Sequence, residues 1–166
     1  MVHKYSVAGP GHDFNDLAIT AAGDVYLTDT RAGAVWHLGK GADLIRLSER
    51  FAFANGIALS PNDSLLYVST FPDGIMVLHL KTNITSPIAR PADLCLAMID
   101  GLYFRRGALT AIQWVHDAAS CPLCADSRFS CDQTIRGSRT PQSFVRWGNH
   151  WSPRGQRFRL HGQHLG

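Results

Sequence analysis

The chain has 166 residues, 45% of them hydrophobic, and a formal net charge of +3. This length fits a single domain with a core, and no run approaches the roughly 18 apolar residues of a membrane-spanning helix, so we expect no membrane partner. The N-terminal residues 1–6 lack the apolar stretch of a signal peptide, which favours a cytoplasmic protein.

The first predicted strands lie between residues 14 and 47. Residues 14–20 alternate between apolar and small or polar types, and Gly23 permits a tight turn because it tolerates positive φ. Residues 25–30 are rich in β-forming types and predict the returning strand. Residues 34–38 predict a third strand, and residues 44–47 predict an outer one.

The same scheme recurs twice. In the second unit, predicted strands at 55–60, 65–70 and 75–80 are separated by turns, of which residues 61–64 combine Pro, Asn, Asp and Ser. The third unit is shorter, with predicted strands at 100–104 and 108–113. No convincing helix is found, and short strands at close spacing predict an all-β fold.

Each unit opens on a polar dipeptide, at Asn15-Asp16, Asn55-Gly56 and Asp100-Gly101, in steps of 40 and 45 residues. Such steps are typical of β-propeller blades of about 40–50 residues. An isolated Asn-Gly or Asp-Gly is more often a plain turn. Three copies before strands instead favour side chains that face a central channel. The sequence predicts a partial propeller over residues 1–113, with two blades and part of a third.

Two stretches resemble a known family. They are Phe14-Asn-Asp-Leu-Ala-Ile with the following Gly23-Asp-Val-Tyr-Leu-Thr-Asp-Thr, and Ala54-Asn-Gly-Ile-Ala-Leu-Ser-Pro-Asn-Asp with Leu-Tyr-Val-Ser. Together with Ile99-Asp-Gly-Leu and Gly107-Ala-Leu-x-Ala-Ile-Gln, they are similar to the senescence-marker-protein/gluconolactonase (regucalcin-like) family, over residues 12–113. This resemblance implies a six-bladed propeller with a divalent cation in its channel, commonly calcium, with zinc or magnesium as alternatives.

The resemblance also implies a site. Asn55 and Asp100 correspond to metal ligands of the family, and Asn15 corresponds to a residue that reaches the substrate. The family's third ligand, a Glu, has no counterpart, because the only Glu is Glu49, which lies in a connector. We expect the blade that carries such a Glu to precede Met1.

The chemistry that the resemblance implies is hydrolysis of a small lactone or ester. Carboxylate and amide oxygens suit a hard cation, which polarises a carbonyl and activates water. Asp100 is the candidate catalytic residue, accepting a proton from water. The alternative is a catalytically inactive propeller fragment that serves as a scaffold or binding module. The oligomeric state cannot be read from the sequence.

Other polar and aromatic residues receive plainer interpretations. Asp29 lies at a strand end and is expected to be solvated or to bond a turn, and His12 is expected at the surface or a blade edge. Tyr26, Trp36 and Tyr67 are expected to pack between blades.

Residues 114–166 differ from the rest in composition. They carry three acidic and seven basic side chains, with no Lys or Glu, whereas residues 1–113 carry ten acidic and nine basic ones. The basicity is thus confined to this tail, and we predict no nucleic-acid partner. Cys121-Pro-Leu-Cys124 is a single C-x-x-C, a weak zinc signal, and interleaved Arg and Trp weakly suggest RNA binding. We favour an irregular, disordered tail that results from a frameshift near Gln113–Trp114.

Overall fold

A computed structural model describes residues 3–89, 96–105, 108–114 and 142–148. The described part consists of antiparallel strands and turns and holds no helix, and so none that could cross a membrane. The all-β prediction is confirmed. The strands are β1 (Phe14–Ile19), β2 (Val25–Asp29), β3 (Ala34–Leu38), β4 (Leu44–Ser48), β5 (Ile57–Leu59), β6 (Leu65–Thr70), β7 (Gly74–His79), β8 (Ile84–Pro87), β9 (Ile99–Arg105), β10 (Ala108–Trp114) and β11 (Gln142–Gly148).

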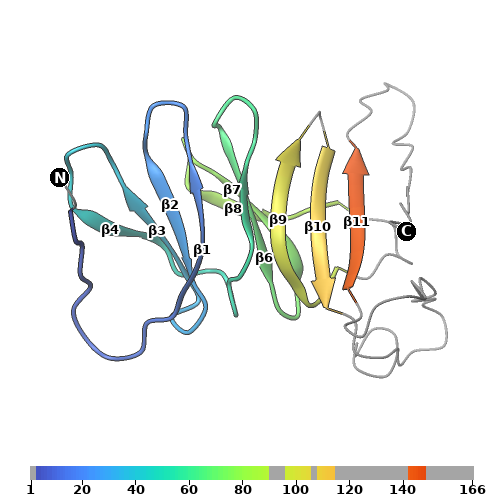
Figure 1. Ribbon diagram of the computed structural model, residues 1–166, viewed down its shortest axis with the longest axis horizontal. Helices are drawn as coiled ribbons and strands as arrows, with labels where there is room; N and C mark the ends of the chain where they lie inside the picture. Colours follow the sequence, from blue (N-terminus) through green and yellow to red (C-terminus); the bar gives the residue numbers. More distant parts are fainter. Residues whose placement is uncertain (1–2, 90–95, 106–107, 115–141, 149–166) are drawn as a thin grey trace.

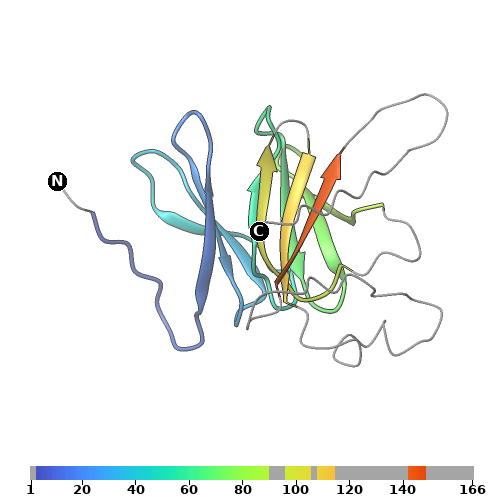
Figure 2. The same ribbon diagram turned by 45° about the vertical axis from the view of Figure 1, so that its right-hand side comes forward.

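The strands form three sheets, which stand side by side in chain order (Figures 1 and 2). Blade 1 is β1-β2-β3-β4, blade 2 is β5-β6-β7-β8, and blade 3 is β9-β10-β11, each meandering from its first strand outward. The first strands of neighbouring blades contact one another, β1 with β5 and β5 with β9. This is the arrangement of consecutive propeller blades around an axis, as the repeat predicts.

Two strands were not predicted from the sequence. β8 completes blade 2 by pairing with β7. β11 lies within the stretch expected to be irregular and pairs with β10 along its whole length, from Ala108↔Gly148 to Trp114↔Gln142. The rest of residues 115–166 lies outside the described residues, and so do Cys121 and Cys124. The frameshift, zinc and RNA interpretations of the tail therefore stay predictions.

The hairpin turns follow from their residues. Gly23 has a φ of 94°, and its amide donates to the Thr20 carbonyl. An L-residue with a side chain is disfavoured in this conformation. In blade 2 the equivalent turn uses Asp63 at a φ of 52°, a region that Asp tolerates better than most residues. The Ser60 hydroxyl accepts hydrogen bonds from the amides of Ser64 and Leu65 and closes this turn.

Two apolar clusters join the blades. Tyr26 of blade 1 packs into the cluster between blades 1 and 2, and Tyr67 packs into the one between blades 2 and 3, as predicted. Trp36 does not. It is buried on the opposite face of blade 1, beneath Arg46, whose guanidinium carbon lies 4.9 Å from the ring centroid. Strand alternation explains the difference, because Trp36 follows Val35, which faces blade 2.

Candidate functional site

The three predicted site residues occupy matching places in the three blades. Asn15 is the second residue of β1, Asn55 lies two residues before β5, and Asp100 is the second residue of β9. In blades 2 and 3 the residue two positions later, Ile57 or Leu102, is buried against the preceding blade. The repeat therefore holds in three dimensions, and the three residues lie at the same end of adjoining strands.

Asn55 is held by its backbone and leaves its side-chain oxygen unused. Its amide donates to the Ser69 carbonyl at 3.0 Å, and its carbonyl accepts from Thr28 Oγ1 at 2.6 Å. Among the described residues, its Oδ1 is buried and has no hydrogen-bond partner. A buried polar atom left unpaired costs about 1–3 kcal/mol. An amide oxygen of this kind fits a hard divalent cation, which binds through carboxylate and amide oxygens.

Asn15 is connected to the residue before Asn55. Its Nδ2 donates to Thr30 Oγ1 at 3.0 Å, and Thr30 Oγ1 donates to the Ala54 carbonyl at 2.6 Å. These two bonds fix which way the Asn15 amide faces, because its nitrogen is turned toward Thr30. Its oxygen is then directed away from Thr30.

Asp100 is exposed on β9 and is positioned by a close approach of two backbones. A Cβ atom on Gly56 would lie 2.8 Å from the Asp100 carbonyl oxygen and 2.7 Å from the Leu102 amide nitrogen. Such distances are too short for any side chain, so glycine is required where β9 passes the start of β5. Ser69 Oγ adds a hydrogen bond of 3.0 Å to the Ile99 carbonyl.

Asp16 differs from its neighbour Asn15, although both open the same unit. Its Oδ2 accepts from the Ile57 amide at 3.1 Å, and its Oδ1 accepts from the Leu17 amide at 2.8 Å. Both carboxylate oxygens thus bond backbone amides, one of them in the next blade. Asp16 is a structural link between blades 1 and 2.

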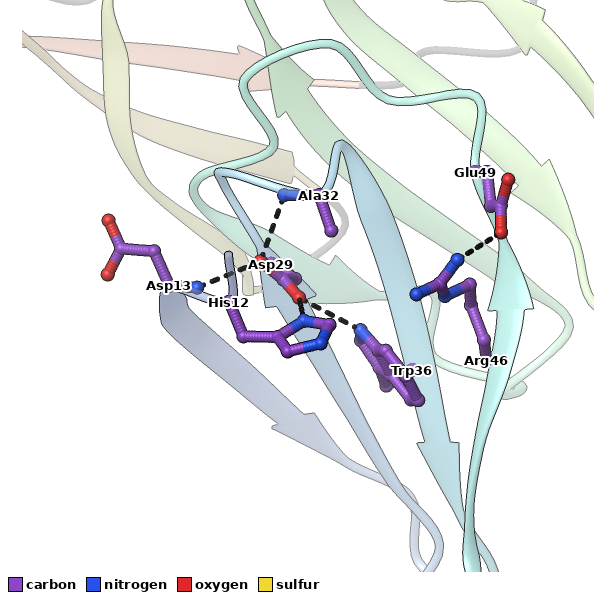
Figure 3. Close-up of polar contacts among 7 residues, drawn as sticks. All are labelled: His12, Asp13, Asp29, Ala32, Trp36, Arg46 and Glu49. Carbon is purple, nitrogen blue, oxygen red and sulfur yellow. Dashed lines mark hydrogen bonds and ion pairs between the residues drawn. The ribbon is translucent and has the colours of Figure 1, made fainter. Parts of the chain in front are cut away.

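A second polar centre, around Asp29, was not predicted (Figure 3). The Asp29 carboxylate is fully buried and accepts four hydrogen bonds. His12 Nδ1 and Trp36 Nε1 donate to Oδ2 at 2.6 and 3.2 Å, and the amides of Asp13 and Ala32 donate to Oδ1 at 3.0 and 3.1 Å. The expectation that Asp29 is either solvated or bonded to a turn is met by the Ala32 amide, and the carboxylate is buried.

Burial raises the pKa of the Asp29 carboxyl, because a charge is costly away from water. The four hydrogen bonds outweigh burial and hold the pKa of Asp29 below its usual value. Every partner is a donor, and so the network favours the ionised carboxylate. His12, which is largely buried, also contacts the Phe14 and Trp36 rings, which contact each other.

A pocket of about 440 Å³ adjoins this centre. It is lined by Asp13, Thr30, Arg31, Ala32, Gly33, Ala52 and Phe53. These residues come from the segment before β1, the β2–β3 turn and the β4–β5 connection. The antiparallel order puts all three segments at the end of the blades where Asn15 lies. The Asp13 side chain points away from Asp29 (Figure 3), and the Phe53 ring is 64% exposed.

Sequence reasoning did not identify the pocket residues. The available signal was positional, since segments before a first strand and turns between second and third strands share one end of a blade. Glu49 lies elsewhere, in an ion pair with Arg46 (Figure 3). Within residues 3–89, 96–105 and 108–113, no three His, Cys, Asp or Glu side chains gather in a way that could hold a metal ion. A cation site here therefore depends on amide oxygens as well.

No protein-family model matches the chain, and no curated protein matches it. Solved structures do resemble it. A gluconolactonase from Xanthomonas campestris is 23% identical, over 69% of this chain and 45% of its own, with a TM-score of 0.52. A chain of a nidogen–laminin complex is 17% identical, over 95% and 51%, with a TM-score of 0.63. Virginiamycin B lyase from Staphylococcus aureus is 10% identical, over 98% and 45%, with a TM-score of 0.59.

These likenesses show a β-propeller fold and, at such low identities, the fold alone. The chain spans about half the length of each of the three structures. This agrees with three sheets arranged as consecutive blades.

Proposed function

We propose that the chain is part of a divalent-cation-dependent hydrolase of the gluconolactonase (regucalcin-like) type, which acts on a small lactone or ester. The observation that carries the proposal is Asn55 Oδ1, buried and without a partner among the described residues, at the position where the family resemblance expects a metal-ligating amide. The similarity of fold to a gluconolactonase supports it. We infer calcium as the cation, with magnesium and zinc as alternatives.

Each site residue has a role in this proposal. Asn55 Oδ1 and the Asp100 carboxylate would hold the cation. When bound, a divalent cation supplies Lewis acidity toward a carbonyl and a nearby water. Asp100 also accepts the proton that water releases as it attacks the carbonyl carbon. Asn15 orients the substrate through its amide, whose nitrogen is engaged by Thr30.

The experiment is a calcium titration of the chain by isothermal calorimetry, first with the wild type and then with Asn55→Leu. Leu has nearly the shape of Asn and needs no hydrogen bond. The variant should be at least as stable as the wild type, because Oδ1 has no hydrogen-bond partner among the described residues and its burial unpaired is unfavourable. It should lose calcium binding. Asp100→Asn should weaken binding, because it removes the site's negative charge.

Asp43→Asn is the matched control for charge. Asp43 is exposed in the β3–β4 turn, at the opposite end of blade 1. It should bind calcium as the wild type does. If the wild type shows no heat of binding at millimolar calcium, the proposed cation site is wrong. A lactone hydrolysis assay, with and without calcium, then tests the reaction itself.

A second candidate is a binding module without catalysis. The pocket beside Asn15 favours it, because it brings a carboxylate, a guanidinium and an exposed aromatic ring together, at Asp13, Arg31 and Phe53. These groups suit recognition of a small polar molecule with an apolar face. Ligand binding without turnover, abolished by Arg31→Ala and Phe53→Ala, would favour this candidate over the hydrolase.

A further inference from the structure

One structural position is exposed in blade 1 and buried in blades 2 and 3. The residue two places after the opening polar residue is Leu17 in blade 1, Ile57 in blade 2 and Leu102 in blade 3. Ile57 is 3% exposed and Leu102 is 1% exposed, because each faces the preceding blade. Leu17 is 52% exposed. Blade 1 therefore presents an inter-blade face with no blade against it in the described chain.

More of this face is apolar. Ile19 and Leu17 alternate with Ala18, which packs toward blade 2, so both point to the other side. Phe14 lies on that side too, in edge-to-face contact with Trp36. Phe14, Leu17 and Ile19 all belong to the large apolar side chains that are exposed. Contiguous exposed apolar surface of this kind marks an interaction site.

Blade 3 also presents an exposed aromatic side chain on its outer face, at the other end of the array. Leu102 and Leu109 face blade 2, so their strand neighbours Tyr103 and Thr110, which pair with each other, face away from it. Tyr103 is 56% exposed. Its place corresponds to that of Ala58 in blade 2, which is buried against blade 3. Tyr103 thus occupies an inter-blade position as well.

We propose that a second copy of this chain covers both faces, with blade 1 of each copy packed against blade 3 of the other. Propellers close with about 4–8 blades, and two sets of three blades make a ring within that range. The length agrees, because the chain spans 45%, 51% and 45% of three propeller structures. Two identical contacts related by a two-fold axis close such a ring without open ends.

The ring has a consequence that rests on the proposed function. It places a second Asn15, Asn55 and Asp100 at the same end of the shared channel. Two carboxylates and four amide oxygens would then line that end, instead of one carboxylate and two amides. The Glu that the family resemblance expects would have a substitute in the second Asp100.

The test is the molar mass of the full chain by light scattering and sedimentation velocity, without calcium and with a chelator. Working without metal separates assembly from the proposed cation site. The wild type should have the mass of two chains at tens of micromolar. Ile19→Lys should raise the dissociation constant at least about 100-fold, since it places an unpaired charge in both contacts.

Ile45→Lys is the matched control, because Ile45 is also a half-exposed isoleucine of blade 1. It pairs with His37, which follows Trp36 in β3. Trp36 lies on the open face, so His37 and Ile45 lie on the opposite face of the sheet. It should remain dimeric. Tyr103→Lys should dissociate the dimer as Ile19→Lys does. A dimer that Ile19→Lys disrupts and Tyr103→Lys leaves intact would mean that blade 1 pairs with blade 1. A folded wild-type monomer at these concentrations would overturn the proposal. It would mean that the apolar faces are covered by another part of the same chain or by a different protein.

Discussion

The two contacts between blades are built differently. Blades 1 and 2 are linked by side chains, since Asp16 bonds the Ile57 amide and Thr28 bonds the Asn55 carbonyl. Blades 2 and 3 are brought together by backbone, at Gly56, with one hydroxyl bond from Ser69. Each contact also buries an apolar cluster. Polar links and a missing side chain thus achieve the same result, which is to fix the start of the next first strand.

The largest losses of stability should come from changes in the apolar clusters, because each of the two contacts contains one. Leu66→Ala in the first cluster and Leu102→Ala in the second each remove a buried leucine. Each should lower the free energy of unfolding by about 2–5 kcal/mol, as measured by urea denaturation. A much smaller loss for one of them would show that its contact depends little on apolar burial.

The next effect separates the two contacts. Gly56→Ala forces a Cβ into the backbone of β9, at 2.7 Å from the Leu102 nitrogen, and should cost about 1–3 kcal/mol. Gly101→Ala is the control, because its Cβ would meet only side chains, the nearest being Tyr103 at 3.4 Å. Denaturation curves should place Gly101→Ala near the wild type. Equal losses would contradict the close approach as the cause.

Smaller effects test the polar links. Thr28→Val removes the donor to the Asn55 carbonyl and should cost about 1 kcal/mol. Ser69→Ala removes the donor to the Ile99 carbonyl and should cost about the same. Calcium titration adds a distinction, because Thr28→Val disturbs Asn55 and should weaken binding. Ser69→Ala removes a bond to Ile99, the residue before Asp100, and should weaken calcium binding less than Thr28→Val does. A larger loss of calcium affinity in Ser69→Ala would contradict this order.

The smallest effect is on pH dependence. The pKa of Asp29 is lower in the folded chain than in the unfolded one, so its ionised form stabilises the fold above the unfolded pKa of about 3.9. This contribution is lost as pH falls through the lowered folded pKa. The stability difference between wild type and Asp29→Asn should shrink below about pH 4. A difference that stays constant from pH 3 to pH 7 would contradict an ionised Asp29.

The sequence predicts the features that recur in each blade, and it predicts few of those that occur only once. The matching places of Asn15, Asn55 and Asp100 could be predicted because each opens an apolar run at a blade period, whereas their roles in a site stay predictions. β8 was missed because Ile84-Thr-Ser-Pro87 is short and lacks clear alternation. The Asp29 centre was missed because Asp29 lies at a strand end and looks like a turn residue. Its side-chain partners His12 and Trp36 are brought to it by the fold, and no local pattern reveals these contacts. The pocket was missed for the same reason, as it combines three loops.

The hydrogen bonds from Asn15 through Thr30 to Ala54 join two of the predicted site positions in series. Because Thr30 Oγ1 accepts one bond and donates the other, a ligand that turns the Asn15 amide also pulls on the peptide that leads into Asn55. Ligand binding at Asn15 would therefore change the position of Asn55 through the Thr30 hydroxyl alone. Thr30→Val would remove both bonds, so that the Asn15 amide and the peptide before Asn55 would respond independently.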